Sequence, residues 1–249
     1  MKPLFRLDGK VALVTGAGNG IGAAAARVLS YQGARVALVD IDDEALQSTA
    51  AEIEGQDRTY SVDLASVEEI RALVEAVKAD FGQIDILVNN AAICPRLSFE
   101  ESTEEDWDRL MTVNAKSQYF LMQAVCPIMK AQGGGKIINM ISTGGRTGSF
   151  ANASIYSGTK GAVAMFSKSV AREVAADNIL VNCVAPGVVD TRLMWNLSEE
   201  KRQAVCDQVP LKRLARPEEI AHVIAFIGSD ECSYATGATF DINGGWIML

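Results

Sequence analysis

Histidine is almost missing from this sequence, since only His222 occurs among 249 residues. A Ser-His-Asp triad would depend on that one residue, and a histidine-rich zinc site is excluded. Because His222 stands in a helix-like stretch, Glu-Glu-Ile-Ala-His-Val-Ile-Ala-Phe-Ile-Gly, we interpret it as structural. An enzyme with this sequence therefore needs an acid or base other than histidine.

Closely spaced cysteines are also missing. The chain has an odd number of cysteines and no Cys-x-x-Cys pair, which excludes a thioredoxin-like redox site and a zinc ribbon. We interpret all of them as free thiols and expect no metal site. They are Cys94, Cys126, Cys183, Cys206 and Cys232.

Positive charge and long apolar runs are scarce. Lysine and arginine number 23 against 31 acidic residues, giving a net charge of −8 at pH 7. Such a chain is a poor ligand for nucleic-acid phosphates and anionic membranes. No apolar run approaches the roughly 18 residues of a membrane span, and charges interrupt the first ten residues, unlike a signal peptide. We expect a cytoplasmic protein with neither nucleic-acid nor membrane partners.

Short β-branched runs alternate with longer amphipathic segments. The expected strands cover residues 11–15, 35–39, 59–62, 84–88, 136–141, 179–184 and 239–242, and the expected helices 21–32, 43–54, 67–81, 103–131, 154–176 and 217–228. Ser66 with Glu69, and Ser102 with Glu105, fit capping boxes at two helix starts. Apolar strands separated by helices predict an α/β fold: a doubly wound parallel sheet of about seven strands with helices on both faces.

A glycine-rich turn joins the first strand to the first helix, as Thr15-Gly-Ala-Gly-Asn-Gly-Ile-Gly22. Glycines let the backbone approach a pyrophosphate, and the helix N-terminus offers free N–H groups and a positive dipole end. A tight strand-to-helix turn alone would also favour glycine. Its place in the first βαβ unit favours a dinucleotide site.

Asp40 ends the second strand, 20 residues after Gly20. A carboxylate there can accept hydrogen bonds from both adenosine ribose hydroxyls. It would repel a 2′-phosphate, and neither the glycine turn nor the segment just after Asp40 carries Lys or Arg. We therefore expect NAD rather than NADP as the cofactor.

Further motifs then follow in a fixed order. They are Asp63-Leu64, Asn89-Asn90-Ala91-Ala92, Met-Thr-Val-Asn114, Ile-Asn-Met-Ile-Ser142, Tyr156-Ser-Gly-Thr-Lys160, Asn182-Cys-Val-Ala-Pro-Gly187 leading to Val189-Asp-Thr191, and Asp241-Ile-Asn-Gly-Gly-Trp246. Together with the glycine turn, these residues resemble the short-chain dehydrogenase/reductase family along essentially the whole chain. Ala92 departs from the family's usual glycine. The resemblance implies one Rossmann-type domain over residues 1–249, with the cofactor bound mainly by 1–140 and catalysis and substrate mainly in 141–249.

The resemblance also implies roles for individual residues. Tyr156 would be the acid or base, Lys160 would bind the nicotinamide ribose, Ser142 would orient the substrate oxygen, and Asn114 would hold a relay water. The implied cofactor contacts are Gly16, Asn19, Gly20, Ile21, Gly22, Asp40, Ile41, Asp63, Leu64, Asn90, Ala91, Tyr156, Lys160, Pro186, Gly187, Val189 and Thr191.

Two hydroxyls compete for the substrate-orienting role. Ser142 precedes Tyr156 by 14 residues, one more than the family leads us to expect, and Thr143 precedes it by 13. Ser142 aligns better from the strand side, so we assign it and keep Thr143 as the alternative.

Tyr156 and Lys160 are four residues apart on an expected helix and share one face. A free tyrosine has a pKa near 10, but a nearby ammonium and the positive nicotinamide both favour the phenolate. We expect these charges to lower the pKa of Tyr156, which could then take the proton of an alcohol. A Tyr-Lys pair alone would more often be a solvated helix face; the other motifs favour the catalytic interpretation.

Three segments beyond strand ends should surround the substrate. Their candidate residues are Arg96, Arg146, Asn152, Arg192 and Trp195. Polar side chains with arginine favour a small polyol, sugar or sugar acid, although nearby acids could neutralise the arginines and leave a neutral polyol as the better hypothesis. A second class is a 3-oxoacyl-thioester reductase, which usually uses NADPH and is disfavoured by Asp40. A third is a non-catalytic NAD-binding regulator, which should have lost Tyr156 or Lys160.

A homotetramer is expected. The segments 103–131 and 154–176 are long, the second is rich in small and apolar residues, and in similar enzymes these helices pair between subunits. The apolar C-terminal segment would be buried at a second contact.

Overall fold

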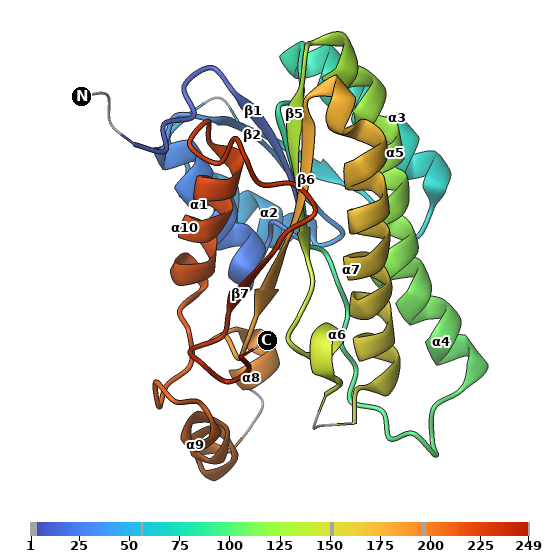
Figure 1. The fold of residues 1–249 in the computed structure, drawn as a ribbon, viewed down its shortest axis with the longest axis vertical. Helices are drawn as coiled ribbons and strands as arrows, with labels where there is room; N and C mark the ends of the chain where they lie inside the picture. Colours follow the sequence, from blue (N-terminus) through green and yellow to red (C-terminus); the bar gives the residue numbers. More distant parts are fainter. Residues whose placement is uncertain (1–3, 56, 150–151, 196–197, 249) are drawn as a thin grey trace.

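Seven parallel strands form one sheet, in the order β3-β2-β1-β4-β5-β6-β7 (Figure 1). The computed structural model describes residues 4–55, 57–149, 152–195 and 198–248. The strands are β1 (Val11–Thr15), β2 (Arg35–Asp40), β3 (Arg58–Ser61), β4 (Ile86–Asn89), β5 (Gly135–Met140), β6 (Ile179–Pro186) and β7 (Thr239–Ile242). The expected doubly wound α/β fold is confirmed. Because the strand order reverses between β1 and β4, the fold places its ligand crevice beyond their carboxyl ends.

Helices cover both faces of the sheet. One face carries α1 (Gly20–Tyr31), α2 (Asp43–Ala50) and α10 (Pro217–Gly228), on the left in Figure 1. The other carries α3 (Val67–Phe81), α5 (Ser117–Ala131) and α7 (Ser154–Val174). The continuous apolar strands follow from this layering, since every residue of β1 and β4 is buried. Burying each Val, Leu or Ile side chain contributes about 1.5–3 kcal/mol, which makes this core the main support of the fold.

Three short helices gather at the carboxyl end of the sheet, at the bottom of Figure 1. They are α6 (Gly144–Thr147), after β5, and α8 (Arg192–Trp195) and α9 (Glu199–Gln208), after β6. None of them corresponds to a helix predicted from the sequence. Because they follow the strand ends, they surround the crevice that the strand order identifies.

Several expected boundaries need correction. Residues 103–131 form α4 (Glu104–Met111), a π-helical turn (Thr112–Lys116) and α5, rather than one regular helix. The capping box of α4 joins Thr103 and Asp106, one residue later than expected. The helix expected over 43–54 ends at Ala50, and that expected over 154–176 becomes a 3₁₀ turn from Ala175.

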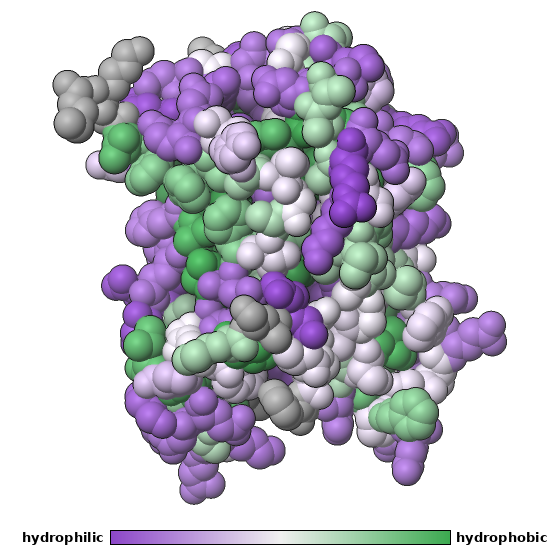
Figure 2. Space-filling view, viewed as in Figure 1, coloured by the Kyte–Doolittle hydropathy of each residue, from purple (hydrophilic) through white to green (hydrophobic). Residues whose placement is uncertain are grey.

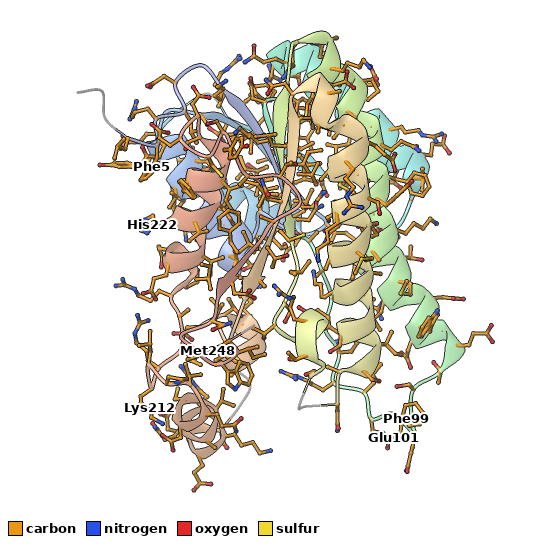
Figure 3. The ribbon with its side chains drawn as sticks, in the orientation of Figure 1. Phe5, Phe99, Glu101, Lys212, His222 and Met248 are labelled. Atoms are coloured by element: carbon orange, nitrogen blue, oxygen red, sulfur yellow. The ribbon has the colours of Figure 1, made fainter. Side chains whose placement is uncertain are left out.

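Two further expectations concern regions outside the crevice. His222 is exposed on α10 and points away from the molecule in Figure 3. Over the described ranges, none of the helices combines the length and apolar character needed to cross a membrane.

Candidate active site

The glycine turn folds back tightly on the start of α1. A Cβ built on Gly22 would lie 1.9 Å from the carbonyl oxygen of Gly16, so no side chain fits there without moving the backbone. Gly16 and Gly20 have φ of +66° and +56°, a left-handed conformation that glycine adopts readily. The geometry of the turn therefore explains why Gly16, Gly20 and Gly22 are all glycine.

Hydrogen bonds fix this turn to the end of β4. The Thr15 hydroxyl oxygen accepts bonds from the backbone N–H groups of Asn90 and Ala91, at 3.0 and 3.1 Å. In return, the Asn90 amide donates to the carbonyl oxygens of Thr15 and Gly16. The two strands that flank the switch point therefore present their ends as one rigid unit.

Asp40 lies beside the same turn. Its carboxylate accepts backbone N–H bonds from Gly18 at 3.0 Å, Ile41 at 2.8 Å and Asp42 at 3.2 Å. A carboxylate has about four acceptor positions, so it can still accept a bond from an incoming hydroxyl. This fits the ribose contact that the sequence suggests for Asp40.

The other expected cofactor residues follow strand ends. Asp63 and Leu64 come after β3, and the segment from Gly187 to Thr191 comes after β6. A Cβ on Gly20 would lie 3.2 Å from Cγ2 of Thr191, which shows that the segments after β1 and β6 meet.

The start of α1 is suited to bind an anion. Within the described chain its N-cap, Asn19, makes no side-chain hydrogen bond to the first turn, and that turn contains no acidic residue. The first N–H groups of a helix attract a phosphate when no side chain caps them. Together with the close backbone approach at Gly16 and Gly22, these features fit a dinucleotide.

Tyr156 and Ser142 meet at the carboxyl end of β5. Tyr156 lies in the first turn of α7, and the side chain of Ser142 is close enough to lower the pKa of the Tyr156 phenol through a hydrogen-bonding interaction. The Ser142 oxygen also accepts a bond from the backbone N–H of Gly144, at 3.1 Å. Thr143 is buried, and its backbone bonds to Pro186 and Arg146. Ser142 therefore lies next to Tyr156, which is compatible with the substrate-orienting role that we predict for it.

Burial dominates the protonation of Tyr156. It raises the pKa of the phenol above its usual value, while the Ser142 hydrogen bond and the charge of Arg96 lower it by less. We expected the Lys160 ammonium and a positively charged nicotinamide to lower this pKa, and burial acts in the opposite direction. Burial therefore favours the protonated phenol, the form that can donate a proton.

Lys160 is fully buried below Tyr156. Its ammonium donates a 2.7 Å hydrogen bond to the carbonyl oxygen of Met140 and lies 5.7 Å from the centre of the Tyr156 ring. Burial lowers the pKa of Lys160 to about 8. A charge held at this depth is costly, and such groups concentrate at functional sites.

Asn114 sits in the π-helical turn, a distortion that recurs at functional sites. Its side chain bonds both backbone groups of Ile93, at 2.8 and 2.9 Å, and contacts the hydroxyl of Thr159 at 3.3 Å. It thereby joins the segment after β4 to α7, next to Lys160.

The proposed substrate residues occupy different environments. Arg146 forms a 2.9 Å ion pair with Asp241, and Arg192 is exposed at the start of α8. Asn152 is exposed with a φ of +42°, and its carbonyl accepts a bond from Leu97. The side chain of Trp195 lies outside the described part of the structure.

Two residues near Tyr156 affect its environment: Arg96 contributes a positive charge and Cys94 contributes a thiol. Arg96 lowers the pKa values of both Tyr156 and Cys94 through its charge. Burial nevertheless raises the pKa of the half-buried Cys94 thiol. From the sequence we interpreted Cys94 only as a free thiol, although its place shortly after the Asn-Asn-Ala-Ala motif is a signal.

Comparison with known proteins decides the family. The model described as enoyl-(acyl carrier protein) reductase, adh_short_C2, matches residues 16–247. The chain belongs to the short-chain dehydrogenase/reductase family. It is therefore an oxidoreductase of the type that uses NAD(P)(H) on small molecules.

Relatives within the family carry different activities in their names. A 3-oxoacyl-(acyl-carrier-protein) reductase FabG of Thermotoga maritima is 39% identical over 98% of this chain and all of its own. A galactitol 2-dehydrogenase of Agrobacterium fabrum is 38% identical over 97% of this chain and 98% of its own. A crystal structure of a protein from Sinorhizobium meliloti 1021, assigned to the short-chain alcohol dehydrogenases, superposes with a TM-score of 0.94 at 32% identity, covering 98% of both chains. Membership of the family therefore does not identify the substrate, which has to be inferred from the residues of the site.

Proposed function

We propose that this enzyme interconverts a secondary alcohol and a ketone with NAD(H), acting on a small hydroxylated molecule such as a polyol, sugar or sugar acid. The observation that carries the proposal is the half-buried Tyr156, whose phenol lies next to the Ser142 side chain and whose ring centre is 5.7 Å from the buried ammonium of Lys160. The retention of Tyr156 and Lys160 argues against a non-catalytic NAD-binding regulator.

The protein residues manage the proton and the orientation of the substrate. The cofactor, when bound, supplies the hydride acceptor or donor. Tyr156 donates its proton to a ketone oxygen, or takes the proton of an alcohol once added positive charge offsets its burial. Ser142, whose oxygen already accepts from the backbone of Gly144, can donate its hydroxyl hydrogen to the same substrate oxygen. Lys160 binds the nicotinamide ribose in this proposal, and Asn114 holds a water that returns the proton to solvent.

Asp40 supports NAD rather than NADP. Its carboxylate is fixed by three backbone N–H bonds, and the segment just after it reads Ile-Asp-Asp-Glu, with no cation. A 2′-phosphate placed there would face only negative charge. We therefore assign the ribose contact to Asp40.

The charges around the site favour a neutral polyol over an acid. Arg146 is paired with Asp241, and among the proposed substrate arginines the charge of Arg96 acts on Tyr156. The second candidate function, reduction of a 3-oxoacyl thioester, is supported by the FabG relatives and disfavoured by Asp40.

A panel of secondary alcohols, sugar acids and a 3-oxoacyl thioester tests the proposal, with NAD(H) and NADP(H) followed by absorbance of the reduced cofactor. We expect turnover of a polyol or sugar with NAD and a much lower kcat/KM with NADP. Equal kcat/KM for the two cofactors would contradict the role of Asp40. Turnover confined to the thioester with NADPH would support the second candidate instead.

Three variants test the catalytic assignments. Tyr156→Phe should lower kcat by about 10²–10⁴-fold while NAD binding persists, because only the acid–base oxygen is removed. Ser142→Ala should also be severe and worse than Thr143→Ala. The reverse order would transfer the substrate-orienting role to Thr143.

A further inference from the structure

An ion pair connects the loop after β5 to the last strand. Nη1 of Arg146, in α6, donates a 2.9 Å hydrogen bond to Oδ2 of Asp241 in β7. Both side chains are partly exposed, at 26% for Arg146 and 29% for Asp241. Asp241 pairs in register with Ala185 of β6. The contact therefore spans β6 and joins two segments 95 residues apart in sequence.

Helix α6 has little intrinsic support. It is four residues long, two of them glycine, and none of them is buried. So short a helix is unstable by itself, and glycine adds to the entropy lost on ordering it. Its position must therefore come from contacts with the rest of the molecule.

The same helix controls two residues of the active site. The backbone N–H of Gly144 holds the Ser142 oxygen at 3.1 Å. A Cβ on Gly145 would lie 2.7 Å from the backbone carbonyl carbon of Lys160, so α6 packs directly against α7 at that residue. A displacement of α6 would move Ser142 relative to Tyr156.

We propose that Arg146 is a positioning residue, whose ion pair with Asp241 holds α6 against α7 and thereby fixes the Ser142 oxygen beside Tyr156. This inference rests on the proposed function of Ser142 and Tyr156. It assigns Arg146 to the enzyme's own framework rather than to an anionic substrate, since its charge is matched by Asp241. A misplaced Ser142 would slow the reaction more than it would weaken substrate binding.

A double-mutant cycle separates the two roles of Arg146. In Arg146→Ala, Asp241→Ala and the double variant we measure kcat and KM for the best alcohol of the panel and for its acid counterpart. We expect each single change to lower kcat about tenfold with KM changed less than twofold, and the double change to cost no more than one single change. Arg146→Lys should retain part of the activity, because it keeps the charge but loses the guanidinium geometry.

The opposite pattern would overturn the inference. If Arg146 binds substrate, its removal raises KM for the acid alone, while Asp241→Ala leaves that KM unchanged or lowers it. Unchanged kcat in both single variants would also overturn it. Arg27→Ala is the matched control, because Arg27 lies on α1 and its ion pairs, with Glu52 at 2.9 Å and Glu218 at 3.8 Å, do not involve α6 or α7, so its loss should leave kcat unchanged.

Hydrogen exchange provides a readout that does not depend on turnover. The backbone N–H groups of Gly145, Arg146 and Thr147 are hydrogen-bonded within this segment, to Ser142 and Thr143. Their exchange should accelerate at least tenfold in Arg146→Ala and Asp241→Ala, and remain unchanged in Arg27→Ala. Unaltered exchange in the first two variants would contradict this inference alone. Full turnover in Ser142→Ala would instead contradict the proposed function.

Discussion

Burial sets the chemistry of the two central ionisable residues in opposite directions. It raises the pKa of Tyr156 and lowers that of Lys160 to about 8, and in each case the neutral form is favoured. From the sequence we expected charge to dominate, because helical spacing alone does not show how deeply α7 is covered. The fold therefore holds the Lys160 ammonium in an unfavourable buried environment, where it is positioned to act on a bound cofactor.

Replacing Lys160 by methionine should stabilise the fold at neutral pH while abolishing turnover. Between pH 8 and the ordinary lysine value of 10.5, the unfolded chain binds more protons than the folded one. The free energy of unfolding of the wild type therefore rises with pH across this window. Below pH 8, the buried Lys160 charge lowers that free energy by roughly 3 kcal/mol. We expect the variant to have the higher Tm at pH 7, with the gap closing as the pH approaches 10.5, in thermal unfolding followed by circular dichroism.

The exposed Lys116 supplies the control, since Lys116→Met removes a lysine from the same region without relieving burial. Its Tm relative to wild type should not vary between pH 7 and 10. A Lys160→Met Tm below that of wild type at pH 7 would mean that the hydrogen bond to Met140 outweighs the burial of the charge.

At the level of secondary structure, the parts predicted best are those with one strong pattern. The bounds of α10 and β7 match the expectation, because Pro217 opens α10 at its first turn and β7 is a short β-branched run. The capping box was misplaced because Ser102 and Thr103 both fit the motif. In the fold, the Ser102 hydroxyl bonds the carbonyl oxygen of Ser98 instead.

Features that depend on contacts between residues far apart in the sequence could not be predicted from local sequence patterns. The apolar pattern of the sequence continues without a break through the π-helical turn, so the pattern does not reveal the turn. In the structure, hydrogen bonds between Asn114 and Ile93 occur at this turn. Helices α6 and α9 bury no residue, so they lack an apolar face to detect. The motifs located Ser142, Tyr156 and the glycine turn, whereas the pairing of Arg146 over 95 residues has no local signal.

Two glycines in helices should respond oppositely to alanine. Gly22→Ala places a Cβ 1.9 Å from the Gly16 carbonyl oxygen, so the turn must shift, at a cost of about 1–3 kcal/mol or more and with weaker NAD binding. Gly158 in α7 has no atom within 4 Å of an added Cβ. Gly158→Ala should therefore gain up to about 1 kcal/mol from helix propensity. Urea unfolding and NAD titration measure both effects, and a destabilised Gly158→Ala would show that this face of α7 is covered in solution.

On the scale of the whole molecule, large apolar side chains remain exposed on the α4, α5 and α7 side. Trp107, Tyr119 and Met165 are 52%, 42% and 62% exposed, and the ring of Tyr119 packs edge-on against Phe166 to join α5 with α7. Such a patch on adjoining helices is typical of a protein–protein contact.

A second apolar area lies on the other side of the sheet. Figure 2 shows hydrophobic surface over α10 and the chain beside it, bordered by polar residues. Phe226 and Phe240 pack edge to face there, 6.2 Å apart, and β7 forms the edge of the sheet. An open edge strand beside an apolar helix face is a natural place for a second contact. Met248, in the apolar C-terminal segment that we expected to be buried in a contact, is 81% exposed.

Two separate apolar areas on one chain fit a tetramer with two kinds of two-fold contact. We predict a solution mass about four times the 26.6 kDa of the chain in light scattering. Met165→Glu puts a charge in the centre of the α4, α5 and α7 patch, and burying it in a contact is costly. This variant should therefore fall to a dimer held by the α10 and β7 side. Tyr31→Glu, at an 84% exposed position on α1, should stay tetrameric. A wild-type mass of one chain would rule out the tetramer, and a tetrameric Met165→Glu would show that the α4, α5 and α7 patch faces solvent.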